Sequence, residues 1–197
     1  MKKLFLIVAL VIFGVSNVYS QGVSFGATGG LFLGSADVEL LGFDISSVSE
    51  DLQVLDGGGF YLGLLADIEV IESFSVQPEL LYANVGGEGA IVVPIMAKYY
   101  VADKFNLQAG PQLDFVLDVP ALVDEFVDTF GVSIGVGVGY DINDTFGIQA
   151  KYSFGLTNRL DKRITDALDE IPDLGFLNID ATLRTNIFQV GVIYKFN

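Results

Sequence analysis

The chain ends in Asn186-Ile187-Phe188-Gln189-Val190-Gly191-Val192-Ile193-Tyr194-Lys195-Phe196-Asn197, where large apolar residues alternate with small or polar ones. Because the side chains of a β-strand point alternately to its two faces, this period of two separates the residues into two sets. One face carries Phe188, Val190, Val192, Tyr194 and Phe196, and the other carries Gln189, Gly191 and Lys195. An aliphatic and aromatic face suits contact with lipid, whereas glycines and amides suit a barrel interior. The stretch therefore predicts a strand of a transmembrane β-barrel.

Seven further stretches alternate in the same way, so that the predicted strands cover residues 22–33, 58–70, 74–83, 90–100, 104–117, 129–141, 145–156 and 186–197. Each is long enough to cross a bilayer at a tilt, which takes about 9–11 residues. The connections are alternately long and short, apart from an intermediate glycine-rich link at 84–89. Transmembrane barrels have short periplasmic turns and longer external loops, so this pattern puts both termini in the periplasm. We predict an all-β fold, an eight-stranded antiparallel up-and-down transmembrane barrel.

Aromatic residues of the outward-facing sets gather near both ends of the predicted strands. Toward the periplasmic ends lie Phe74, Tyr99, Phe105, Tyr140, Phe146, Tyr194 and Phe196, and toward the opposite ends lie Phe60, Tyr82, Phe115, Phe130 and Phe154. Two such rows match the aromatic girdles at the two surfaces of a membrane. Pro78, Pro94 and Pro111 fall inside predicted strands, where each removes a ladder donor. We expect bulges or locally frayed pairing beside them.

The N-terminus has the features of a secretory signal. Lys2 and Lys3 precede an apolar stretch over residues 4–15, and Val18-Tyr19-Ser20 provides a small-x-small cleavage site. The apolar stretch falls short of the roughly 20 residues that a spanning helix needs. We expect residues 1–20 to be a cleaved signal peptide, residues 21–197 to form one barrel domain, and the outer membrane to be its location.

Composition narrows the classes of function. The chain has 25 acidic against 10 basic residues and a net charge of −15, which argues against nucleic acid as a partner. It contains neither cysteine nor histidine. Their absence removes cysteine- and histidine-dependent catalysis and most transition-metal sites. We expect no enzymatic activity, no cofactor and no metal site.

Polar and charged residues on the inward faces form a candidate site, because they come from neighbouring strands. They are Asp67, Glu79, Lys98, Gln112, Asp114, Lys151, Gln189 and Lys195. Opposite charges crowded into a narrow interior must pair, since an isolated buried charge is very costly. An eight-stranded barrel leaves room for little beyond side chains, so we expect a structural salt-bridge network. The alternative is a gated proton or ion path, or a small-ligand site.

The long connections carry a second candidate site. Leu160, Ile164, Leu168 and Ile171 follow helical spacing, and a second apolar piece lies at 119–127. These pieces either fold over the barrel mouth or form a surface that docks a partner protein, since exposed apolar patches tend to mark interfaces. The acidic groups Asp37/Glu39, Glu50/Asp51 and Asp169/Glu170/Asp173 lack the spacing of a calcium loop, so we expect only diffuse attraction of cations there.

Short motifs in the middle of the chain resemble the small outer-membrane barrel family of Bacteroidetes-type bacteria, called PorT-like. They are Gln77-Pro78-Glu79-Leu80-Leu81-Tyr82, Val93-Pro94-Ile95, Lys98-Tyr99-Tyr100, Gln108-Ala109-Gly110-Pro111-Gln112 and the final 191–196. The resemblance implies the barrel fold and the outer membrane. It implies little about activity, since most members have no assigned role and only a few look tied to protein secretion. The chain departs from the family in ending on Asn197 rather than on an aromatic residue.

These patterns lead to three hypotheses of function. The first is an integral outer-membrane protein, expected to be a monomer in lipid, that serves envelope structure or docks an envelope or secretion-system protein through its external loops. The second is a narrow channel or transporter for small solutes or ions through the polar interior. The third is a soluble ligand-binding barrel, which would require the phenylalanine and valine stripes to turn inward around a cavity.

Overall fold

The computed structural model describes residues 22–40, 43–44, 57–85, 87–117, 128–159 and 181–196. Its strands are β1 (Val23–Leu40), β2 (Phe43–Asp44), β3 (Gly57–Ile71), β4 (Phe74–Val85), β5 (Glu88–Ala102), β6 (Phe105–Val116), β7 (Phe130–Asp141), β8 (Phe146–Gly155) and β9 (Ala181–Phe196). Over these ranges, no helix has the length and apolar character needed to cross a membrane. The expected signal peptide, residues 1–20, and the expected docking segment, Leu160–Ile171, lie outside the described residues.

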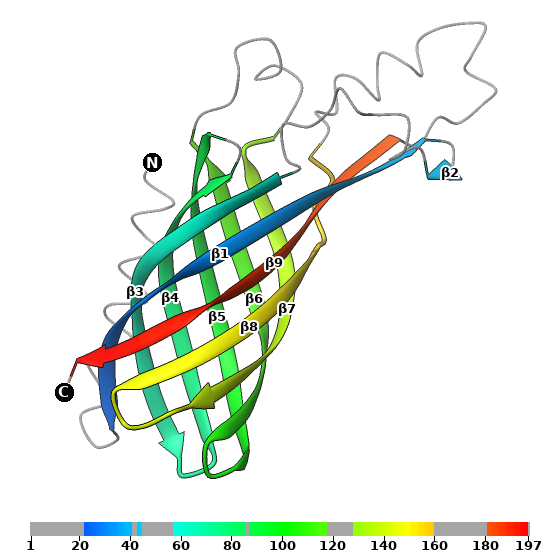
Figure 1. Ribbon diagram of the computed structural model, residues 1–197. Coiled ribbons are helices and arrows are strands. Elements are labelled where there is room, and N and C mark those ends of the chain that lie inside the picture. The colour runs from blue at the N-terminus through cyan, green and yellow to red at the C-terminus, as the bar shows by residue number, and fades with distance from the viewer. Residues whose placement is uncertain are drawn as a thin grey trace, which may run out of the picture.

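The sheet closes on itself. Consecutive strands from β3 to β9 pair antiparallel, β1 pairs with β3, and β9 returns to pair with β1 (Figure 1). The predicted eight-stranded antiparallel barrel is therefore confirmed, formed by β1 and β3 to β9. We call the end with the connections at 72–73, 103–104 and 142–145 the turn end, and the opposite end the loop end.

β1 and β9 are longer than the sequence predicted. β1 was expected to end at residue 33 and β9 to begin at 186, but their pairing continues from Gly34↔Ile187 to Leu40↔Ala181. Figure 1 shows the two strands projecting together beyond the rest of the barrel at the loop end. Each strand supplies the other's ladder partners, so the extension forms despite its acidic sequence. Asp37 and Glu39, expected in a loop, lie on β1.

The glycine-rich link at 84–89 is shorter than predicted. β4 runs to Val85 and β5 starts at Glu88, and these two residues pair across the hairpin. Gly87 has a φ of 98°. Only glycine adopts this conformation at no steric cost, which allows so short a connection.

The prolines are accommodated by gaps in the pairing. Beside Pro78, the β3–β4 pairing passes from Leu65↔Glu79 to Ile68↔Val76 and omits two positions without a change of register. The same gap occurs beside Pro94 between β4 and β5 and beside Pro111 between β5 and β6. A proline nitrogen has no hydrogen to donate, so the ladder is interrupted locally. This is the frayed pairing that the sequence predicted, whereas the register shifts fall at Glu69/Ile71 and Tyr100/Ala102.

The two faces of the wall have the predicted orientation. Leu62 is 57% exposed and Val192 is 52% exposed on the outside, whereas Lys98 and Lys151 inside are 1% and 2% exposed. Outward-facing Phe146 and Tyr194 pair near the turn end with ring centroids 5.2 Å apart. Phe115 and Phe130 pair at the loop end at 4.9 Å. The outside therefore carries a continuous apolar surface with aromatic pairs at both of its edges.

Candidate functional site: the barrel lumen

All eight polar residues that the sequence placed inside the barrel point into its interior, which we call the lumen. Seven of them are buried, and the side chain of Lys195 is 14% exposed. The structure joins five in one network, pairs Asp114 with a residue that the sequence analysis missed, and leaves Gln112 and Gln189 outside that network. The five joined residues are Asp67, Glu79, Lys98, Lys151 and Lys195.

Glu79 on β4 is the centre of the network. Its Oε2 accepts a hydrogen bond from Lys151 Nζ at 2.7 Å, and its Oε1 accepts one from Gln77 Nε2 at 2.6 Å. Gln149 Nε2 also donates to Oε1, at 3.3 Å. The side chains of Glu79 and Lys151 are 0% and 1% exposed. A buried pair is tolerated only when further hydrogen bonds satisfy both charges, and the two glutamines provide them for the carboxylate.

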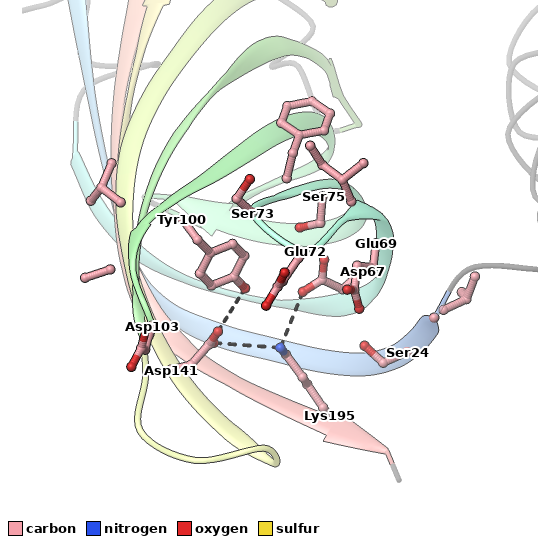
Figure 2. Close-up of a pocket in the computed structure, with 16 residues that line it drawn as sticks. Ser24, Asp67, Glu69, Glu72, Ser73, Ser75, Tyr100, Asp103, Asp141 and Lys195 are labelled. Carbon is pink, nitrogen blue, oxygen red and sulfur yellow. Dashed lines mark hydrogen bonds and ion pairs between the residues drawn. The ribbon is translucent and has the colours of Figure 1, made fainter.

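Asp67 on β3 holds a second group of charges, nearer the turn end. Its Oδ2 accepts from Lys98 Nζ at 2.8 Å and lies 3.4 Å from Lys195 Nζ. Lys195 Nζ is also 3.8 Å from Asp141 Oδ1, and Tyr100 donates to Asp141 at 2.9 Å (Figure 2). Lys98 joins the two groups, because its Nζ also donates to Gln77 Oε1 at 3.0 Å.

An apolar cluster packs on one side of the lumen, toward the loop end from these charges. It consists of buried side chains from β1, β3, β4, β5 and β9, none more than 5% exposed: Phe32, Tyr61, Leu81, Ala83, Val92 and Ile187. We call this set the plug. The alternation in the sequence predicts a polar lumen, and this apolar cluster corrects that prediction. The inward positions of β4 and β5 change from polar to apolar toward the loop end. Across the strands, however, Phe32 is paired with Gln189, Val92 with Asp114 and Ile187 with Ser153, so the cluster occupies one side of the lumen and polar residues occupy the other.

Asp114 lies apart from the other charges, near the loop end. It accepts a hydrogen bond from Arg159, and both side chains are buried. Arg159 follows β8, and its backbone is held on two sides: its N–H donates to Leu183 O, and its carbonyl accepts from the Asp128 N–H, at 2.9 and 2.8 Å. The structure therefore separates Asp114 from the network at the turn end.

Gln112 and Gln189 contribute differently. Gln112 Oε1 accepts from Ser153 Oγ at 3.2 Å, whereas Gln112 Nε2 has no partner among the described residues. Gln189 is 1% exposed, and neither polar atom of its side chain has a partner within the described ranges.

Sequence reasoning missed four network members and Arg159. Gln77 and Gln149 lie two residues from Glu79 and Lys151 on the same strand face, so the period of two could have included them. Tyr100 and Asp141 lie near strand ends, where the alternation gives no signal about contacts. Arg159 lies four residues beyond Gly155, the last residue of β8, so no strand pattern could have found it.

The lumen opens at the turn end into a pocket of about 720 Å³ (Figure 2). Its walls come from β1, β3 to β5, β7 and β9 and from the turns at 72–73 and 103–104. The charged groups on its walls are Asp67, Glu69, Glu72, Asp103, Asp141 and Lys195. Among the described residues, no three acidic side chains are grouped closely enough to hold a metal ion. The pocket is therefore an acidic vestibule, closed on its inner side by the ion-pair network.

Several solved structures of outer-membrane barrels are similar to this chain. The attachment invasion locus protein Ail of Yersinia pestis is 12% identical, with a TM-score of 0.46 over 88% of this chain and 98% of Ail. OprG of Pseudomonas aeruginosa is 14% identical, with a TM-score of 0.45 over 90% of this chain and 97% of OprG. Neisserial surface protein A is 14% identical, with a TM-score of 0.49 over 89% of this chain and 99% of that protein.

The sequence itself carries the family assignment. No curated protein sequence matches the chain. The model of the outer membrane protein beta-barrel domain family matches residues 5–196. This match is to the broader family, so the narrower resemblance to PorT-like barrels stays a prediction. The wall orientation, the closed antiparallel sheet and this match agree, and the chain belongs to the outer membrane protein beta-barrel domain family.

Proposed function

We propose that this outer-membrane barrel is a non-conducting, non-enzymatic envelope protein that acts through its ends, stabilising the envelope or docking an envelope or secretion-system protein through its external loops. The proposal treats the barrel as a lipid-embedded monomer exported by a cleaved signal peptide. The absence of histidine and cysteine from the chain supports the non-enzymatic part.

The plug is the observation that carries the proposal. Leu81 and Ala83 are 0% exposed and Val92 is 1% exposed, so these three side chains are closed to water. An ion that passed along this side of the lumen would lose part of its hydration without gaining polar partners from these side chains, which is costly. The buried charged groups of the lumen network are occupied by one another, as the contacts between Glu79 and Lys151 and between Asp67 and Lys98 illustrate.

A narrow channel is the second candidate, favoured by the polar lining of the turn half of the lumen. Conductance of the purified protein in planar bilayers separates the two functions. We expect no unitary current steps from the wild-type chain. Leu81→Ala, inside the plug, and Leu80→Ala, facing outward on the same strand, form a matched pair. If the wild-type protein gives unitary current steps, and if these steps are larger in the Leu81 variant but not in the Leu80 variant, then current crosses the lumen. That result would show that the protein is a channel and would refute our proposal.

The docking part requires a separate experiment, because the external loops lie outside the described residues. Deletion of Leu160–Ile171 removes the expected docking segment. If a partner is bound there, cross-linking on intact cells should capture it with the full chain and lose it with the deletion, while the barrel still folds. A folded deletion variant that retains every partner would exclude this segment as the docking surface.

A further inference from the structure

The three prolines of the wall lie side by side. Pro78 is on β4, Pro94 on β5 and Pro111 on β6, each away from the ends of its strand. Pro78 is paired with Ile95, the residue after Pro94. Pro94 is paired with Gln112, the residue after Pro111. The prolines therefore form one continuous row across three neighbouring strands.

Each proline removes one hydrogen bond from the wall. Pro78 keeps its pairing with β5 but loses its pairing with β3, which places its nitrogen toward the carbonyl of Ala66. A proline nitrogen has no hydrogen, so that carbonyl has no ladder donor. The same loss occurs for the carbonyl of Glu79 opposite Pro94 and for that of Ile95 opposite Pro111. We call these three prolines and the three residues opposite them the proline row.

The rest of the wall has no such row. β7 and β8 pair at every position from Ser133↔Gly155 to Asp141↔Gly147, and β6 and β7 pair at every position from Phe105↔Tyr140 to Phe115↔Phe130. Within a bilayer no water replaces a missing backbone donor, so each unpaired carbonyl is costly. Segments with fewer backbone hydrogen bonds open at lower free energy than their surroundings. The proline row is therefore the part of the wall that opens most easily.

The buried ion pairs of the lumen lie at the same height as the proline row. Glu79 belongs to the row, and its side chain reaches Lys151 on β8 at 2.7 Å. Asp67 and Gln77 are the next facing positions, where the pairing of β3 with β4 also lapses. Both accept a hydrogen bond from Lys98 Nζ on β5, at 2.8 and 3.0 Å. Side chains thus join β3, β4, β5 and β8 where the ladder bonds are missing.

We propose that the proline row is a hinge in the barrel wall and that the Glu79–Lys151 and Asp67–Lys98 ion pairs hold it closed. When these pairs break, strands β3 to β6 open locally at the row and water enters the lumen there. The other side of the wall, β7 and β8, stays paired. The hinge goes beyond the proposed function, because it requires neither a docked partner nor an ion current.

Amide hydrogen exchange of the full chain in uncharged detergent micelles, followed by mass spectrometry, tests the proposal. Glu79→Gln/Lys151→Met removes one ion pair without leaving a charge unpaired. In this variant the amides of residues 77–80 and 93–96 should exchange at least about tenfold faster than in the wild-type protein, because a hydrogen bond to a charged group contributes at least that factor. The amides of residues 134–138 on β7 should change by less than about twofold.

A second variant tests the role of the prolines. Pro111 is exposed on the outside of β6, so Pro111→Ala removes little packing and restores an N–H opposite the carbonyl of Ile95. Exchange at residues 93–96 should become about fivefold slower, as expected for one added backbone hydrogen bond. The matched control Pro172→Ala makes the same chemical change outside the described strands and should leave this exchange unchanged. Heat resistance of each variant in detergent verifies that the barrel is folded.

Two results would overturn the proposal. If Glu79→Gln/Lys151→Met accelerates exchange on β7 as much as at the proline row, the ion pair stabilises the whole barrel and does not hold a hinge closed. If Pro111→Ala and Pro172→Ala give the same exchange at residues 93–96, the prolines do not determine where the wall opens. Neither result bears on the bilayer measurement, so this proposal and the proposed function can fail separately.

Discussion

Glu79→Gln is the sharpest perturbation of the lumen network. The substitution preserves the size of the side chain and removes its charge. Lys151, 2% exposed, then loses the carboxylate that lies 2.7 Å from its Nζ. In the wild-type protein, the Nε2 atoms of Gln77 and Gln149 donate to Glu79 Oε1. The amide of the variant brings its own N–H donors toward these two donors. The variant therefore leaves a buried charge without its opposite charge and introduces competing donors.

The expected loss of stability follows from that geometry. Removing one partner of a buried ion pair costs about 3–5 kcal/mol, mostly because the other charge stays buried. If unfolding in urea has a slope of about 2 kcal/mol per molar, a loss of about 4 kcal/mol lowers the midpoint by about 2 M. Replacing both partners, as in Glu79→Gln/Lys151→Met, removes the orphaned charge. The double variant should therefore recover about 2–3 kcal/mol of coupling energy.

The assay is urea unfolding of the barrel from lipid vesicles, followed by the mobility of folded and unfolded chains on gels without boiling. Glu72→Gln is the matched control, because it makes the same chemical change at an exposed turn residue with no ion pair among the described residues. Its midpoint should stay within about 0.3 M of wild type, as expected for an exposed surface substitution. A Glu79 variant as stable as this control would refute the structural role of the network.

Three further changes test other parts of the barrel by the same assay. Lys98→Glu puts a second carboxylate beside Asp67 and should lower stability by at least about 3 kcal/mol; unchanged heat resistance in detergent would contradict this. Gly63→Ala should destabilise far more than Gly58→Ala, because a Cβ at Gly63 would lie 2.2 Å from a backbone oxygen, whereas at Gly58 it would meet only a flexible leucine side chain at 3.1 Å; equal effects would contradict the close approach. Asn143→Ala should cost about 1 kcal/mol, because its Oδ1 accepts two backbone N–H bonds in the turn at 142–145, and Asn143→Asp should retain most of this stability.

The sequence by itself determined the class of fold, the number of strands in the barrel and the face of each strand that meets lipid. These are local properties, because the direction of a side chain on a strand depends only on its position in a period of two. The same rule placed Lys98, Glu79 and Lys151 in the lumen before any contact was known. It also identified the short connections, since a hairpin between neighbouring strands needs few residues.

Only the tertiary structure decided which inward residues meet. Lys98 pairs with Asp67 rather than with Glu79, and Glu79 pairs with Lys151, 72 residues away in the sequence. The plug, the extension of β1 along β9 and the vestibule depend in the same way on how the closed sheet aligns distant strands. Strand tilt and register fix the height of every inward side chain around the barrel, and the period of two contains no information about height.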